Sequence, residues 1–298
     1  MSGRNRKRSG IWPRLAATLL LVLILFCVYQ LSTGLGEKPH SVSLEEIPPF
    51  SGDPFVVLYN NQPQFSPEDM TNKSYEYYAP LDVWGRCGYT MACIGRDLMP
   101  TEDREGISQV KPTGWVQKQY DSVDGKNLYN RCHLIGFQLT GENANERNLI
   151  TGTRYCHVEG MLPFENMVAD YIKETGNHVL YRVTPVFQGQ ELVARGIQME
   201  AYSVEDQGAG ICFHVYVYNN QPGVTIDYAS GESWLSTQVQ PSVSVGNVVY
   251  ILNTSSKKFH EENCKQGASI KESNKELFQG HRADIIKMGY TPSKCCNP

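Results

Sequence analysis

The fold is decided by the stretch Tyr129-Asn130-Arg131-Cys132-His133-Leu134-Ile135-Gly136-Phe137. On an extended strand, Arg131 and His133 share one face, while Cys132 and Leu134 face the core. A guanidinium can bind a phosphate in fork geometry, and an imidazole can take a proton near neutral pH. The pair is therefore a candidate site for an anionic substrate. A buried histidine that only satisfies its own hydrogen bonds is the alternative.

Three polar residues follow the histidine in an order that strengthens this candidate. Asn148 lies fifteen residues after it, His157 nine residues further on, and Glu165 eight residues after that. Pro163 can open a helix, and an apolar face begins at Phe164, so Glu165 falls in the first helical turn, off the apolar stripe. Taken singly, these residues are ordinary turn, loop and helix-start residues. Their joint order and spacing indicate a site.

This order resembles the DNA/RNA non-specific endonuclease family, and within it the bacterial extracellular, membrane-attached branch. The likeness runs from about residue 75 to 235. It implies an α+β fold, with a ββα-metal nuclease core on an antiparallel sheet. It also implies metal-dependent, sequence-nonspecific hydrolysis of phosphodiester bonds in DNA and RNA, which leaves 5′-phosphate ends. No small-molecule cofactor is expected.

The resemblance implies roles for four residues in catalysis. His133 matches the general base, and Arg131 matches an arginine that contacts phosphate. Asn148 matches an asparagine that positions the histidine or the substrate, and Arg86 matches a further arginine near the substrate. The expected alternative function is a non-catalytic surface protein that binds nucleic acid or another polyanion.

The resemblance also implies that His157 and Glu165 hold a divalent metal, Mg²⁺ or Mn²⁺. The family has asparagine where this chain has His157, and aspartate and glycine where it has Asn130 and Cys132. Imidazole is a better ligand for Mn²⁺ or Zn²⁺ than for Mg²⁺. An altered metal preference, with Zn²⁺ possible at the His157 site, is therefore expected; reduced activity is the alternative.

The composition is that of a globular protein, with 41% hydrophobic and 19% charged residues over 298 positions. Five of the 27 basic residues, and no acidic one, fall in the first 36 positions, so the rest carries 22 bases against 31 acids. This balance excludes a protein that coats nucleic acid with a global positive field. Nucleic acid would therefore have to bind in a local basic cleft.

The N-terminus carries a basic head before an apolar run over residues 15–31. This pattern predicts a single-pass membrane anchor with the catalytic domain outside; a cleaved signal, and a secreted protein, is the alternative. We expect six segments: a cytoplasmic tail (1–14), the anchor or signal (15–32), a linker (33–50), the nuclease domain (51–235), a second linker (236–246) and a C-terminal module (247–298).

The C-terminal module resembles small Ada-like metal-binding modules. Their pattern is a histidine and a cysteine four apart, followed by a Cys-x-x-Cys pair, and here Ser293 replaces the first cysteine of that pair. A possible second metal site, for structural Zn²⁺, therefore consists of His260, Cys264, Cys295 and Cys296. A Cys264–Cys296 disulfide is the alternative. A surface protein whose active part is this module is a third interpretation of the whole chain.

The periodicity predicts the remaining elements. We expect strands over 81–94, 114–120, 127–135, 178–187, 190–202, 210–218 and 223–228, and helices from 163 to 175 and around 271–287. The aromatic residues Tyr75, Tyr77, Tyr78 and Trp84 are either base-stacking candidates or ordinary core and surface residues.

Overall fold

The computed structural model describes residues 41–236, 249–280, 285, 288–293, 295 and 296. The predicted cytoplasmic tail and apolar segment lie outside the described residues, as does the second linker from residue 237 on. Within the described part of the chain, no helix has both the length and the apolar character needed to cross a membrane.

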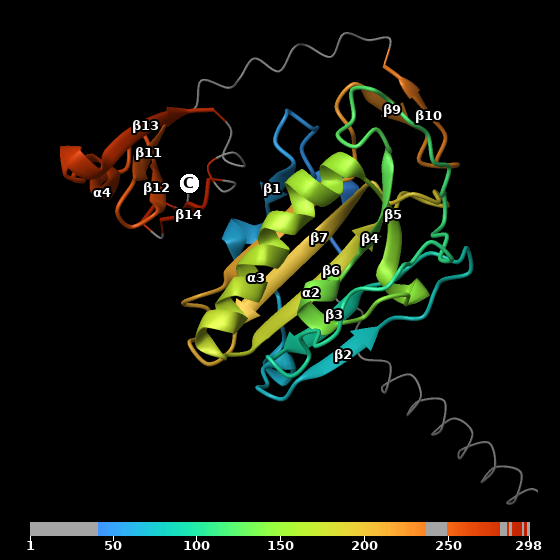
Figure 1. Cartoon of the computed structure of the whole chain (residues 1–298), viewed down its shortest axis with the longest axis horizontal. Helices are drawn as coiled ribbons and strands as arrows, with labels where there is room; N and C mark the ends of the chain where they lie inside the picture. Colours follow the sequence, from blue (N-terminus) through green and yellow to red (C-terminus); the bar gives the residue numbers. More distant parts are fainter. Residues whose placement is uncertain (1–40, 237–248, 281–284, 286–287, 294, 297–298) are drawn as a thin grey trace, which may run out of the picture. The chain divides into compact units, whose positions relative to one another are not determined.

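A six-stranded antiparallel sheet forms the centre of the predicted nuclease domain (Figure 1). Its strands, in spatial order, are β1 (Phe55–Val57), β8 (Cys212–Tyr218), β7 (Gly196–Ser203), β6 (Val179–Val186), β3 (Thr90–Ile94) and β2 (Tyr75–Tyr78). Odd-numbered residues of β6, β7 and β8 face one side and even-numbered residues face the other, because successive side chains on a strand alternate.

Helix α3 (Leu162–Thr175) covers the odd-numbered face of the sheet (Figure 1). Its buried Phe164 packs edge-on against Phe55, with ring centroids 4.9 Å apart. Proline stands in its first turn, and Gly176 ends it with a φ of +75°, a left-handed conformation that glycine adopts without strain. The predicted limits of this helix are therefore confirmed.

The segment before residue 66 covers the even-numbered face. It contains the short turns η1 (Leu44–Glu46) and η2 (Tyr59–Asn61), and η3 (Pro67–Asp69) follows it. Its backbone bonds to polar side chains of the sheet: Val42 N–H donates to Gln198, and Gln64 N–H donates to Glu200. Glu200 also pairs with Arg182 at 2.8 Å, and both side chains are buried. The predicted linker 33–50 is thus, from residue 41 on, partly packed on the domain.

The second unit of the domain is a two-stranded antiparallel ribbon of β4 (Tyr129–His133) and β5 (Leu149–Thr153). The short helix α2 (Phe137–Thr140) and the turn η4 (Glu146–Asn148) connect the two strands. A π-helical turn, η5 (Cys156–Met161), leads from β5 into α3. A hairpin of β9 (Val224–Ile226) and β10 (Ser233–Leu235) completes the domain. The predicted α+β fold with antiparallel sheets is confirmed.

Three predicted strands of this domain are wrong in extent, and one of them, 190–202, begins only at Gly196 of β7. Residues 81–89 form a turn rather than the first half of a strand, because the Asp82 carboxylate accepts from the backbone N–H groups of Trp84 and Arg86. Residues 114–120 keep only an isolated bridge, between Gln119 and Asn127. Gly114 adopts a φ of +66°, which an extended strand does not allow.

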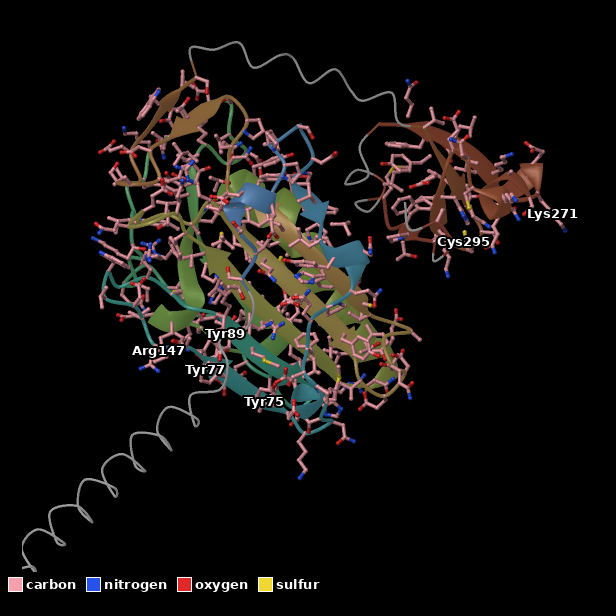
Figure 2. The ribbon with its side chains drawn as sticks, turned by 180° about the vertical axis from the view of Figure 1, so that it is seen from behind. Tyr75, Tyr77, Tyr89, Arg147, Lys271 and Cys295 are labelled. Atoms are coloured by element: carbon pink, nitrogen blue, oxygen red, sulfur yellow. The ribbon has the colours of Figure 1, made fainter. Side chains whose placement is uncertain are left out.

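The aromatic residues near β2 pack largely against one another. Tyr77 and Tyr89 have ring centroids 5.2 Å apart, and Tyr75 and Tyr89 pack against the same small buried cluster (Figure 2). Trp84 lies 4.5 Å from the Arg86 guanidinium. Base stacking by these rings stays a prediction.

The C-terminal module has a four-stranded sheet in the order β13 (Lys275–Gln279), β11 (Val249–Asn253), β12 (Lys258–Glu261) and β14 (Thr291–Pro292). The short helix α4 (Lys265–Ala268) and the turn η6 (Glu272–Asn274) lie between β12 and β13. The helix predicted around 271–287 is wrong in its first half, because residues 275–279 pair antiparallel with β11. Sheet pairing here overrides local helix propensity.

Candidate active site

His133 ends strand β4, opposite Leu149 of β5, and is buried. Its Nε2 lies 2.7 Å from the backbone carbonyl oxygen of Asn143. A carbonyl can only accept, so Nε2 carries the proton of the neutral ring and Nδ1 carries the lone pair. A terminal nitrogen of Arg104, which can only donate, lies 3.5 Å from Nδ1 and agrees with this tautomer. The basic atom of His133 is therefore Nδ1.

The surroundings of His133 hold its imidazole in the neutral form. Burial lowers its pKa below the ordinary value, and the positive charge of Arg104 lowers it further. The hydrogen bond to the Asn143 carbonyl opposes this shift without reversing it. A neutral imidazole at physiological pH is the form that can accept a proton.

Asn148 is fully buried and holds the chain that follows the histidine. Its carboxamide oxygen accepts from Ile135 N–H and its NH₂ group donates to Ile135 O, both at 2.9 Å. Its own backbone oxygen accepts from Leu134 N–H at 2.8 Å. These three bonds fix the exit from β4, so Asn148 acts on the backbone beside His133. A catalytic contribution from it stays a prediction.

His157 lies in the π-helical turn η5, where its Nδ1 is 2.9 Å from the Asn130 carboxamide nitrogen. Rotating that carboxamide would let its oxygen accept from Nδ1–H and free the Nε2 lone pair for a metal. Burial, followed by the charges of Arg154, Arg104 and His133, lowers the pKa of His157 to about 4. Imidazole is then neutral, as a metal ligand must be. The contribution of Asn130 was not foreseen in the sequence.

Glu165 is buried in the first turn of α3 rather than exposed at the helix start. Burial raises its pKa to about 7, and a hydrogen bond from Gln138 and the charge of Arg104 oppose this. Among the residues described, it forms no salt bridge. Gly136 leaves the space for it: a Cβ there would come within 2.6 Å of Glu165 Oε2. A buried carboxylate without a paired base suits a bound cation.

Arg104 is the residue that links these groups, and it was not predicted from the sequence. It lies exposed in the loop before β4, and its charge affects the pKa values of His133, His157 and Glu165. No carboxylate pairs with it within the described chain. The guanidinium is therefore available to a phosphate. A lone arginine in an acidic loop carries no motif that could have singled it out.

The two arginines expected at the substrate, one of them on a phosphate, have protein partners. Arg131 donates to the backbone oxygens of Val110 and Ser108, and its guanidinium lies 4.2 Å from the Trp115 ring centre. It therefore fixes the loop that precedes β4.

Arg86 is buried and bonds to the Asp82 carboxylate at 2.7 Å and to two backbone oxygens at 2.9 Å. Its guanidinium also stacks on the rings of Trp84 and Phe187. Substrate contacts by Arg86 and Arg131 stay predictions.

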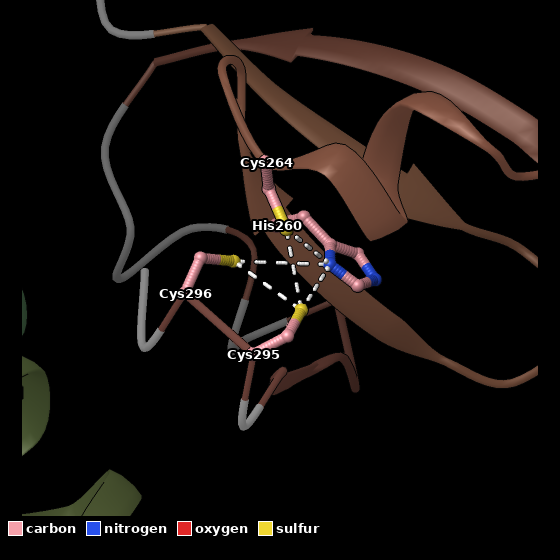
Figure 3. A group of neighbouring side chains, drawn as sticks. All are labelled: His260, Cys264, Cys295 and Cys296. Atoms are coloured by element: carbon pink, nitrogen blue, oxygen red, sulfur yellow. Dashed lines mark hydrogen bonds between the residues drawn. The ribbon is translucent and has the colours of Figure 1, made fainter.

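The four residues expected to form a second metal site come together in the C-terminal module (Figure 3). His260 lies on β12, Cys264 precedes α4, and Cys295 and Cys296 follow β14. The ligand atoms of all four lie within 4.8 Å of one another.

Comparison with known sequences finds a likeness to nucleases in the part of the chain before the C-terminal module. Residues 67–205 match the family model for DNA/RNA non-specific endonuclease. A deoxyribonuclease from Streptococcus dysgalactiae subsp. equisimilis is 33% identical over 196 residues, which cover 52% of this chain and 59% of that protein. The chain thus spans less than two thirds of the length of this relative.

Comparison with solved structures extends the likeness to the fold. NucA from Streptococcus agalactiae, with a magnesium ion bound, is 27% identical at a TM-score of 0.54, over 60% of this chain and 86% of that one. The Sda1 nuclease with a bound zinc ion is 26% identical at a TM-score of 0.50, over 62% of this chain and 97% of that one. Residues 67–205 are thus similar in sequence to the DNA/RNA non-specific endonuclease family, and the chain is similar in fold to the NucA and Sda1 nucleases.

Proposed function

We propose that this protein is a metal-dependent endonuclease that cleaves DNA and RNA without reading base sequence. The observation that carries the proposal is the hydrogen bond from His133 Nε2–H to the Asn143 carbonyl, because it leaves Nδ1 as a basic lone pair beside Arg104. The name of the relative from S. dysgalactiae, a deoxyribonuclease, supports DNA as the substrate. A role for RNA rests on the family alone.

The proposed reaction uses His133 as general base. Nδ1 removes a proton from water while the water oxygen attacks phosphorus, and the bond from phosphorus to the 3′ oxygen breaks. The 3′ oxygen leaves and takes a proton from solvent, so the products carry a 3′ hydroxyl and a 5′ phosphate. Arg104, which has no paired carboxylate within the described chain, would bind a phosphate oxygen and offset its growing charge.

His157 and Glu165 would hold the divalent cation. When bound, the cation would supply positive charge to the scissile phosphate and to the leaving oxygen. The buried, unpaired carboxylate of Glu165 fits such a cation. Because His157 offers nitrogen, we propose a preference for Mn²⁺ or Zn²⁺ over Mg²⁺. Among its relatives, NucA was solved with magnesium and Sda1 with zinc.

We propose that the catalytic domain acts outside the cytoplasm, either anchored by residues 15–31 or secreted. The support is the basic head and the apolar run of the sequence. Detecting the domain on intact cells, by protease accessibility, would distinguish this location from an internal one.

Plasmid cleavage with added metals tests the proposed activity. His133→Ala should lose at least about 100-fold in rate, since general-base catalysis contributes this much, and should keep the wild-type circular dichroism spectrum. His178→Ala is the matched control, because His178 pairs with Glu205 rather than with any site residue. End-labelling of the products would identify the 5′ phosphate. An unchanged rate in the folded His133→Ala protein would exclude the mechanism, and DNA binding without cleavage by the wild type would favour a binding protein.

The metal preference has its own test. His157→Asn should shift the preferred metal from Mn²⁺ or Zn²⁺ toward Mg²⁺, measured as cleavage rate against metal concentration. Identical metal profiles in wild type and variant would remove His157 from the site.

A further inference from the structure

We propose that His260, Cys264, Cys295 and Cys296 bind a structural Zn²⁺ ion in the C-terminal module, with the adjacent pair Cys295 and Cys296 as two of its four ligands. This site shares no residue with the proposed active site and does not depend on nuclease activity. The argument rests on the geometry of the four ligand atoms, on the odd number of thiols and on the groups that surround them.

Five of the six separations between the ligand atoms lie between 3.2 and 3.8 Å. His260 Nδ1 is 3.2 Å from Cys295 Sγ, 3.4 Å from Cys264 Sγ and 3.8 Å from Cys296 Sγ (Figure 3). Cys295 Sγ is 3.2 Å from Cys264 Sγ and 3.8 Å from Cys296 Sγ. Zinc bond lengths in a tetrahedron give about 3.8 Å between two sulfurs and about 3.6 Å between nitrogen and sulfur. The cluster is therefore close to the geometry of a four-ligand zinc site.

The number of thiols favours a metal over a disulfide. Three thiols surround one imidazole nitrogen, and all three are free in the structure. A single disulfide would pair two of them and leave the third beside an unused imidazole nitrogen. One zinc ion would engage all four groups, because thiolate and imidazole are its usual ligands.

The groups around the cluster suit thiolates held at a metal. The backbone N–H of Gly267 donates to Cys264, and that of Glu261 donates to Cys296. Donors of this kind orient and stabilise ligating groups. Gly267 also permits close packing, because a Cβ at this position would lie 2.9 Å from the Cβ of His260.

Ser293 shows how the adjacent pair replaces a spaced one. It is buried, and its hydroxyl oxygen lies 3.2 Å from Cys295 Sγ. The hydroxyl can donate to the Cys295 thiolate, so the residue at 293 supports the ligand at 295 from outside the metal shell. The ligand that Cys-x-x-Cys spacing would place at position 293 thus lies at position 295, and the number of ligands stays at four.

The ion would connect three parts of a small module. Its ligands come from strand β12, from the start of α4 and from the segment after β14. The module has a small described core that includes Leu252, Phe259, Ile285 and Tyr290. A core of this size contributes little stability, and structural metals commonly supply the rest. We therefore expect the fold of the module to depend on zinc.

The test uses the full chain, purified without added zinc and kept in Mg²⁺ buffer. Elemental analysis should find zinc, and a thiol-blocking mercurial should release one equivalent, detected with a chromogenic chelator. Cys295→Ser should weaken zinc binding at least tenfold in a chelator competition, and Cys212→Ser, a cysteine of β8, should leave it unchanged. His157→Ala should also leave the thiol-released zinc unchanged, which separates this site from the proposed catalytic metal.

A second measurement does not depend on any variant folding. Titration of the metal-free full chain with Co²⁺ should give intense thiolate charge-transfer bands and the visible bands of tetrahedral cobalt. The proposed catalytic ligands contain no thiolate and cannot produce the charge-transfer bands. Wild-type protein without these bands and without thiol-released zinc would overturn the proposal, as would a mass 2 Da lower that maps to a disulfide of Cys264. Full zinc affinity in folded Cys295→Ser would overturn the role of Cys295.

Discussion

At the scale of single residues, one backbone carbonyl determines which nitrogen of His133 carries the proton. Burial and the charge of Arg104 lower the pKa of the same ring. Nothing in the sequence around position 133 specifies these partners, because Asn143 contributes its backbone and Arg104 stands 29 residues earlier. Strand alternation placed His133 on one face with Arg131, and the family resemblance implied that it is the general base. Neither could predict the tautomer, which depends on contacts made across the fold.

Replacing Arg104 should change the pH dependence of cleavage. Arg104→Gln removes a positive charge beside His133, so the pKa of His133 rises and the acid limb of kcat/KM moves to higher pH. A pH–rate profile measures this directly, and Arg147→Gln, an exposed arginine of η4, is the control. An acid limb that stays in place would show that Arg104 does not act on the base.

Glu165 should destabilise the metal-free domain at high pH. Its pKa is about 7 in the folded protein against a usual value of 4.5, so the folded state favours the protonated form. That stabilisation is complete below about pH 4.5 and is lost as the pH rises through about 7. In EDTA at pH 8, the free energy of unfolding of Glu165→Gln, measured with urea, should therefore be about 3 kcal/mol higher than that of the wild type.

The comparison at pH 4 should show little difference between the two proteins, because Glu165 is then protonated in both the folded and the unfolded state. Glu159→Gln, from the preceding π-helical turn, is the control. Equal stability of Glu165→Gln and wild type at pH 8 would contradict a buried, uncompensated carboxylate.

At the scale of elements, helix α3 and the central strands were predictable because their signals are local. Proline and glycine mark the two ends of α3, and alternation along β8 marks one buried face. The other face was not predictable. Gln198, Glu200 and His214 are polar residues that the alternation assigns to solvent, yet all three are buried. They are covered by the segment before residue 66, which is distant in sequence.

The buried pair on that covered face should be sensitive to the loss of one partner. Glu200→Gln leaves the Arg182 guanidinium buried without its carboxylate, and we expect a loss of about 3–5 kcal/mol in unfolding free energy. Chemical denaturation measures it. Glu205→Gln breaks the more exposed pair with His178 and should cost about 1 kcal/mol or less. Similar losses in both variants would contradict the argument from burial.

At the scale of the whole molecule, the residues proposed to perform the reaction and to hold the catalytic metal lie between residues 104 and 165. The cysteine cluster lies beyond residue 259, in the C-terminal module. The two groups draw on different strands and on different hydrophobic clusters. The proposed chemistry and the proposed zinc site therefore occupy separate parts of the chain.

A shortened chain that ends at Ser236 should still cleave plasmid DNA. It retains the six-stranded sheet, the β4–β5 ribbon and α3, which together position His133 and Glu165. We expect a turnover rate comparable to that of the full chain at saturating DNA, measured with the same metal. A folded but inactive shortened protein would show that the C-terminal module contributes to the reaction.

Gly136 restricts which substitutions the site around Glu165 can tolerate. A Cβ at position 136 would come within 2.6 Å of Glu165 Oε2, so any other residue there would require the Glu165 carboxylate to move. In a library that samples every amino acid at position 136, glycine should be enriched among the variants that cleave DNA. The proposed metal site would therefore depend on a residue that is not one of its ligands.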